Sequence, residues 1–287
     1  IDAEKVSGLM SRDDIGYLAE MMNYPGVLAK DPQVVAKLQS ARRERKPVDG
    51  HAPGLIGAQA KAYADAGITT DHECTTLSEA IDKIECGMKI LIREGSAARN
   101  FEALKSLIDS HPSQVMFCSD DKHPDELALG HINLLVRRAI AEGANLFNVL
   151  RAACLNAVEH YRLPVGRLRA GDPADLILVS DLRDFSIERV YIDGQLVAEN
   201  GRSLIQPMPP VPINHFQCAA SKPTDFRLPV TGKMSSVSVR VIEAIDGSLV
   251  TGESRTQLDV IDGEVASNVA ADVLKIVVVN RYRSAPP

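Results

Sequence analysis

Short apolar runs alternate with longer helical patterns from residue 1 to about residue 161. The apolar runs have the length of β-strands and cover 16–22, 47–52, 68–73, 89–94 and 114–119. The helical patterns between them cover 31–46, 57–66, 76–86 and 98–111. A strand followed by a helix and another strand, repeated along the chain, predicts βαβ units around a parallel sheet.

Two predicted helices end the first region, and the pattern changes after residue 161. Two amphipathic helices are predicted at 129–143 and 146–161, because their apolar residues recur at spacings of three and four. Short β-rich runs separated by turn residues follow in 165–179 and 188–197, where Asp193-Gly194 is a hairpin signal. This segment therefore predicts an all-β appendage.

A proline-rich segment separates the β-rich segment from the last part of the chain, and this composition is typical of a stiff linker. Beyond it, strand patterns at 235–242 and 273–279 indicate the start of another α+β domain. The predicted organisation has βα units in 1–161, a β-rich segment in 162–206, and a linker with an α+β domain in 207–287. The prolines of the linker are Pro207, Pro209, Pro210 and Pro212.

Composition narrows the class of protein. A net charge of -6 and the absence of a long Lys/Arg run argue against nucleic-acid binding. The longest uncharged apolar run, 276–279, is far too short to span a bilayer. The five cysteines are scattered without a C-x-x-C spacing, so we expect neither disulfides nor structural zinc, and we expect a reducing cytoplasm.

Ionisable residues cluster where the predicted strands end. Because the carboxyl ends of the strands carry the catalytic groups in barrels of βα units, these residues are candidates for one site. They are Glu20, His51, His72, Glu73, Arg93, Glu94, Asp120 and Asp121.

Two of the candidates, His51 and His72, lie at the ends of successive predicted strands. Imidazole is the commonest ligand for transition metals, and matched histidines favour a metal site over two unrelated structural histidines. Asp120 could ligate a metal and accept a proton from water, or serve in an Asx-turn or helix cap. Taken alone, Glu20 would be interpreted as a solvated or salt-bridged glutamate.

Several strings of residues resemble the bacterial adenine deaminases of the amidohydrolase superfamily, in the order found there. The strings are AEMMNYPG at 19–26, VDGHAPG at 48–54, TDHE at 70–73, IREGS at 92–96 and CSDDKHP at 118–124. The match continues at 130–132 and 166–176 and resumes at 272–281, so the resemblance spans essentially the whole chain.

The resemblance implies a divalent metal centre, binuclear and using Mn or Fe, with Zn as an alternative. Glu20 would be the bridging carboxylate of barrel strand 4, and His51 and His72 the ligands of strands 5 and 6. Asp120 would be the ligand of strand 8 and the group that accepts the proton of water. Asp121 is the alternative if the register differs by one residue.

The family also has an H-x-H pair on strand 1, and no two histidines here are two residues apart. The resemblance therefore implies an α/β fold that is the C-terminal part of a (β/α)8 TIM-like barrel, with a small β-sandwich and the start of a C-terminal α+β domain. The sequence begins with Ile1 rather than Met, so we expect a fragment whose missing N-terminal segment supplies the first strands.

The implied reaction is hydrolytic deamination of adenine to hypoxanthine and ammonia, within purine salvage by a homo-oligomer. Glu73 is expected to be a second proton shuttle or a support for His72. The alternatives are an amidohydrolase acting on cyclic amides, which would favour a carboxylated lysine at the position of Glu20, and a non-catalytic fragment. The residues expected to bind substrate are Arg93, Glu94, Ser96, Asp121 and His123.

Overall fold

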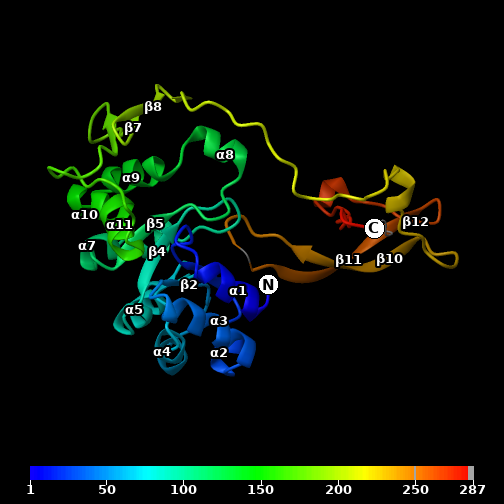
Figure 1. Cartoon of the computed structure of the whole chain (residues 1–287). Helices are drawn as coiled ribbons and strands as arrows, with labels where there is room; N and C mark the ends of the chain where they lie inside the picture. Colours follow the sequence, from blue (N-terminus) through cyan, green and yellow to red (C-terminus); the bar gives the residue numbers. More distant parts are fainter. Residues whose placement is uncertain (249, 284–287) are drawn as a thin grey trace. The chain divides into compact units, whose positions relative to one another are not determined.

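The structure is a computed structural model that describes residues 1–248 and 250–283. It divides into two compact units, Ile1–Ile205 and Gln206–Pro287. Figure 1 shows the element order from the N-terminus in blue to the C-terminal segment in red. Among the described residues, no helix is both long and apolar enough to cross a membrane.

Parallel strands form the centre of the first unit, and each lies within a range predicted from the sequence. One parallel pair joins β1 to β2, and a second parallel sheet has the order β3-β4-β5. The strands are β1 (Leu18–Met21), β2 (Val48–Gly50), β3 (Thr70–Asp71), β4 (Lys89–Arg93) and β5 (Val115–Cys118).

The two sheets meet between β2 and β3, where Thr69 N donates to Val48 O at 2.8 Å. Gly50 ends β2 at the closest approach of these strands. A Cβ atom added there would lie 2.3 Å from Thr70 O and 2.7 Å from Ile68 Cγ2. Glycine therefore allows the end of β2, and the His51 that follows it, to lie against β3.

The helices between these strands agree with the sequence prediction, except that one predicted helix is divided into two. The predicted helices 31–46, 57–66 and 76–86 correspond to α3 (Pro32–Arg43), α4 (Gly57–Asp65) and α5 (Leu77–Glu85). Helix α3 begins after Asp31, whose carboxylate accepts from Gln33 N and Val34 N. The predicted helix 98–111 is instead two short helices, α6 (Phe101–Leu104) and α7 (Leu107–Ser110).

Other helices were not predicted or begin elsewhere. The sequence did not predict α1 (Ala3–Met10) or α2 (Tyr24–Leu28), and α8 (Pro124–Leu129) lies just before the predicted helix 129–143. Helix α9 (Ile132–Ala141) begins later than predicted, because Gly130 has a φ of 150° that a helix cannot contain. The predicted helix 146–161 is continuous, with α10 (Leu146–Leu150), a π-helical turn (Arg151–Leu155) and α11 (Asn156–Tyr161).

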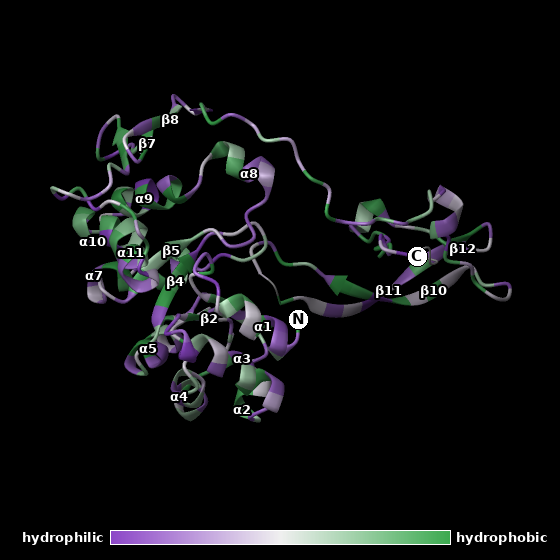
Figure 2. Ribbon diagram, viewed as in Figure 1, coloured by the Kyte–Doolittle hydropathy of each residue, from purple (hydrophilic) through white to green (hydrophobic). Residues whose placement is uncertain are grey.

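Two apolar clusters hold this unit together. One surrounds Ile90 and Ile92 of β4 and includes Phe101 and Val136; the other surrounds Val48 of β2. In Figure 2, green and purple alternate along the helices, as expected for helices with one buried and one exposed face. Burial of these faces holds the helices against the strands and so fixes the positions of the strand ends.

The predicted β-rich segment forms one antiparallel sheet in the order β6-β7-β8-β9. Asp193 and Gly194, both with positive φ, form the turn between β7 and β8, which confirms the hairpin signal. The described residues 162–206 supply one sheet only, so the second layer of a β-sandwich does not come from them. The strands are β6 (Leu176–Val179), β7 (Ile187–Ile192), β8 (Gln195–Glu199) and β9 (Arg202–Ser203).

The second unit contains the antiparallel sheet β10 (Ser236–Glu243), β11 (Gly252–Ile261) and β12 (Glu264–Val265). Strand β10 matches the predicted strand 235–242. The predicted strand 273–279 forms only the bridge of Val273 with Asn268, because the rest of it has no neighbouring strand to pair with among the described residues. Instead of an α+β domain, the described part of this unit has strands and two 3₁₀ turns without an α-helix.

Candidate metal centre

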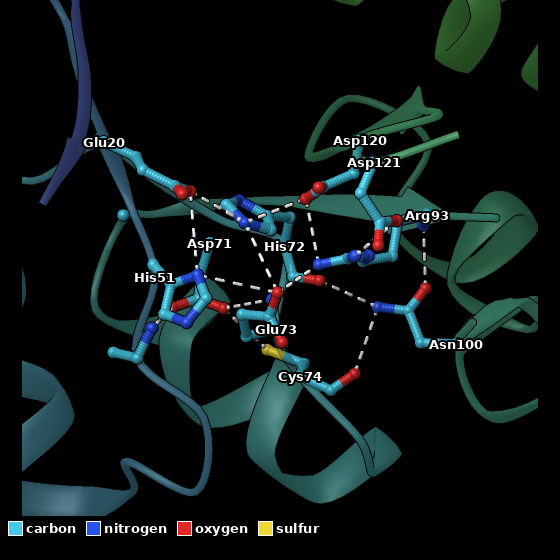
Figure 3. Close-up of polar contacts among 12 residues, drawn as sticks. Glu20, His51, Asp71, His72, Glu73, Cys74, Arg93, Asn100, Asp120 and Asp121 are labelled. Atoms are coloured by element: carbon cyan, nitrogen blue, oxygen red, sulfur yellow. Dashed lines mark hydrogen bonds and ion pairs between the residues drawn. The ribbon is translucent and has the colours of Figure 1, made fainter. Parts of the chain in front are cut away.

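Three predicted ligands come together at the carboxyl ends of β1, β2 and β3 (Figure 3). Glu20 lies within β1, His51 directly follows β2, and His72 directly follows β3. Glu20 Oε2 is 2.8 Å from His72 Nε2 and 3.7 Å from His51 Nδ1. The two imidazole rings lie edge to face, with their centroids 5.3 Å apart.

Two carboxylates complete the cluster from the other side. Asp120 follows β5 in a turn with a φ of 46°, and its Oδ2 is 3.2 Å from His72 Nε2. Glu73 Oε1 is 3.6 Å from His51 Nδ1 and 3.5 Å from His72 Nε2. Two overlapping groups could therefore hold a metal ion, with ligand atoms within 4.8 Å of one another: Glu20, His51 and His72, and His72, Glu73 and Asp120.

The donor set fits a divalent cation. His51 Nδ1 and His72 Nε2 are both buried, and neither makes a hydrogen bond within the part of the chain that the structure describes. Imidazole nitrogens and carboxylate oxygens are ligands that Mn, Fe and Zn all accept. Buried nitrogens that face carboxylates without a hydrogen bond are what a metal site requires.

The excess of carboxylates around the two histidines also favours binding of a cation. Burial alone would lower the pKa of His72, but the carboxylates of Glu20, Asp120 and Glu73 outweigh it and raise that pKa. Contact with His72 in turn lowers the pKa of Glu20. A bound divalent cation would compensate the same carboxylates and leave His72 neutral, as a ligand must be.

Arg93 is the charged neighbour of the cluster and is only 3% exposed. Its guanidinium contacts Glu73, pairs with Asp120 at 2.9 Å and pairs with Asp121 at 3.1 Å. The structure thus places Arg93 and Asp121, both expected to bind substrate, in one ionic network beside the metal-binding groups.

The other residues expected to bind substrate contact neighbouring loops and helices. The Glu94 carboxylate pairs with Arg138 of α9 at 3.2 Å. Ser96 Oγ donates to Glu126 of α8 and accepts from His123 N at 2.9 Å. These contacts join the loop after β4 to the loop after β5.

Comparison with known proteins identifies the family. The family model described as "Amidohydrolase family" matches residues 3–197. The chain belongs to the amidohydrolase family. A crystal structure of a β-aspartyl dipeptidase from Fervidobacterium islandicum AW-1 matches 71% of this chain and 62% of that chain, with a TM-score of 0.52 at 15% identity. This structural match shows a shared fold.

Curated relatives of this amidohydrolase include several adenine deaminases. That of Salinibacter ruber is 51% identical over 279 residues, covering 97% of this chain and 50% of the relative. That of Methanosarcina acetivorans is 50% identical over 297 residues, covering 100% of this chain and 53% of the relative. The chain spans about half the length of these relatives. The resemblance to adenine deaminases seen in the motifs is confirmed.

Sequence reasoning missed the residues that hold the cluster in place. Tyr63 OH of α4 donates to Met21 O at 2.6 Å and accepts from His51 N at 3.1 Å, which joins the ends of β1 and β2. Asn100 Nδ2 donates to His72 O at 3.1 Å, and Asn100 Oδ1 accepts from Arg93 N at 2.8 Å. In the sequence, a tyrosine in an amphipathic helix indicates only a core position, so no signal marked these contacts.

Replacing Tyr63 with Phe is expected to lower the free energy of unfolding by about 1–3 kcal/mol, the cost of leaving buried polar groups without partners. Tyr63 is 0% exposed, so water cannot replace its hydroxyl at His51 N and Met21 O. Urea unfolding of Tyr63→Phe measures the change. Tyr17→Phe is the control, because Tyr17 is 40% exposed. Equal stability of both variants would contradict the role of the Tyr63 hydroxyl.

Proposed function

We propose that the protein catalyses hydrolytic deamination of adenine to hypoxanthine and ammonia, a reaction of purine salvage. The main support is the convergence of Glu20, His51, His72 and Asp120 at the carboxyl ends of parallel strands. The choice of adenine rests on the relatives, which are adenine deaminases at 43–51% identity.

We further propose that β1 to β5 are consecutive strands of a (β/α)8 barrel. Consecutive parallel strands with helices between them are the repeating unit of that barrel. A closed barrel requires eight such strands, and this chain spans about half the length of its relatives. On this proposal 1–161 is barrel, 162–206 is a β-rich segment, and 207–287 forms the linker and C-terminal domain.

A divalent metal, either a single ion or a pair, would be held by Glu20, His51, His72 and Asp120. Mn and Fe are our first candidates and Zn is an alternative, since such sites accept several metals. When bound, such a metal lowers the pKa of water from about 15.7 to about 7 and so supplies hydroxide at neutral pH.

The chain's own residues would move the protons of the reaction. Asp120 accepts a proton from the attacking water and passes it to the departing amino group, which leaves as ammonia. Glu73, whose pKa is raised by burial, protonates the adjacent ring nitrogen and regains a proton from the added hydroxyl when the carbonyl of hypoxanthine forms. Arg93 contacts Glu73 and Asp120, and so holds both carboxylates toward the reacting carbon.

Two loops would shape the purine pocket. Arg93, Glu94 and Ser96 lie at the end of β4 and in the loop that follows it, and Asp121 and His123 lie in the loop after β5. We propose that the contacts between these loops fix the width of the pocket, with Asp121 and His123 nearest the substrate.

A panel of substrates tests the function. The protein expressed from its complete gene, supplied with Mn²⁺ or Fe²⁺, is expected to release ammonia from adenine. We expect little release from other aminopurines and no hydrolysis of cyclic amides such as hydantoin. Hydrolysis of a cyclic amide in preference to adenine would contradict the proposal.

A further inference from the structure

We propose that Lys83, a buried lysine in α5, positions the two loops that carry His51 and His72 and thereby sets the affinity of the site for metal. The inference rests on the proposed metal centre and assigns a role to residues outside it. Lys83 is 0% exposed and lies in α5, within the first unit. It is a positioning residue, since its ammonium group contacts Ala52, Asp71 and Glu79 within the described part of the chain, and these are not proposed ligands.

The ammonium group of Lys83 has three oxygen neighbours. Nζ donates to Ala52 O at 2.7 Å and to Glu79 Oε1 at 2.8 Å, and it lies 3.3 Å from Asp71 Oδ2. Ala52 directly follows His51 in the chain, and Asp71 directly precedes His72. One buried charge therefore connects the residues next to both proposed histidine ligands.

Asp71 joins the same two loops through their backbone. Its Oδ2 accepts from Ala52 N at 2.9 Å, and its Oδ1 accepts from Glu73 N at 2.7 Å. Figure 3 shows the Asp71 carboxylate next to His51 and Glu73. Both the N–H and the carbonyl of Ala52 are thus held, which fixes the direction in which the chain leaves His51.

Glu79 provides the second connection. Its Oε1 accepts from Gly54 N at 2.8 Å, and its Oε2 accepts from Thr75 N at 3.0 Å. Gly54 belongs to the loop after His51, and Thr75 to the loop after His72. The carboxylates of Asp71 and Glu79 therefore each contact both loops, and Lys83 contacts both of these carboxylates.

The energetics favour positioning over stability as the reason for this lysine. A buried ion cluster stabilises a fold no better than well-packed apolar side chains of similar volume, because its desolvation is costly. What apolar residues cannot do is fix backbone N–H and carbonyl groups in one arrangement. Outer partners that orient metal ligands change metal affinity by about 10- to 100-fold.

The test is the affinity for Mn²⁺, measured by competition with a chelator on the protein expressed from its complete gene. Lys83→Met is expected to weaken Mn²⁺ binding by about 10- to 100-fold. The matched control is Lys61→Met, since Lys61 forms an equally short i,i+4 pair with Asp65 at 2.8 Å but is 65% exposed. We expect unchanged affinity in the control.

A second variant covers the case in which Lys83→Met does not fold. Glu79→Gln keeps the size of the side chain but has one acceptor oxygen, so it can satisfy Gly54 N or Thr75 N and not both. We expect weaker Mn²⁺ binding and faster hydrogen exchange of the Gly54 amide or the Thr75 amide. Exchange is read without metal and so reports the loops directly.

The outcomes separate this role from the proposed function. Unchanged Mn²⁺ affinity in a folded Lys83→Met or in Glu79→Gln would overturn the role of Lys83, whether or not the protein deaminates adenine. Weakened affinity in a protein inactive on adenine would support the role and refute the proposed function. A wild-type protein that binds none of Mn²⁺, Fe²⁺ and Zn²⁺ would refute both.

Discussion

The Asp120→Asn variant of the protein expressed from its complete gene is expected to lose about 10²- to 10⁴-fold in kcat for adenine deamination, the usual contribution of a general acid–base. The amide keeps the shape of the side chain but can neither accept the proton of water nor match the charge of a carboxylate ligand. Asp120 Oδ2 lies 3.2 Å from His72 Nε2 and 2.9 Å from the Arg93 guanidinium, so the substitution changes the centre of the cluster. Steady-state kinetics at saturating Mn²⁺ and adenine measure the loss.

Asp125→Asn is the matched control, because Asp125 is an exposed aspartate five residues along the same segment. We expect its kcat to equal that of the unchanged protein. Metal content is measured in parallel, so that loss of the metal is distinguished from loss of the proton acceptor. Near-normal turnover of Asp120→Asn would refute the assignment of Asp120.

The second large effect is expected on stability, from Gly50→Ala. The new Cβ would lie 2.3 Å from Thr70 O and 3.0 Å from Tyr63 Cε1. The first of these atoms belongs to the backbone of β3, so relief requires the strands to move apart. We expect the free energy of unfolding to fall by about 1–3 kcal/mol, as for other overpacked cores. Urea unfolding of the metal-free protein measures this change.

Gly8→Ala is the control for this substitution. Gly8 lies inside α1, and a Cβ there meets nothing within 4 Å. Alanine stabilises a helix interior by roughly 0.5–1 kcal/mol relative to glycine, so the two Gly→Ala changes should have opposite signs. If Gly50→Ala were as stable as the unchanged protein, the close approach of β2 and β3 would be wrong.

The strands and most helices of the first unit could be predicted because their signals are local. A run such as Lys89–Arg93 has β-strand length and an apolar interior, and helix α3 begins after the capping residue Asp31. Predicted strand 273–279 carries the same kind of local signal and yet forms no strand. A strand needs a hydrogen-bonding partner, and local sequence does not say whether one is present.

The sequence predicted that the candidate residues lie at the ends of the strands, but it did not predict the direction of each side chain. Arg93 ends β4 and Glu94 directly follows it, and neighbouring residues of extended backbone point to opposite sides. Arg93 therefore contacts Glu73 and Asp120, whereas Glu94 pairs with Arg138. The sequence-based prediction grouped both as substrate-binding residues. Only the direction of each side chain shows that they have different neighbours.

By itself, the sequence determined the family, the positions of the strands along the chain, and the four candidate ligands Glu20, His51, His72 and Asp120. Apolar runs fix the strands, and parallel strands bring their carboxyl ends to one edge. The tertiary structure decided which supporting residues surround those ligands. The contacts of Lys83 and Tyr63 connect residues 31 and 42 positions apart, and such contacts depend on how helices pack on the sheet.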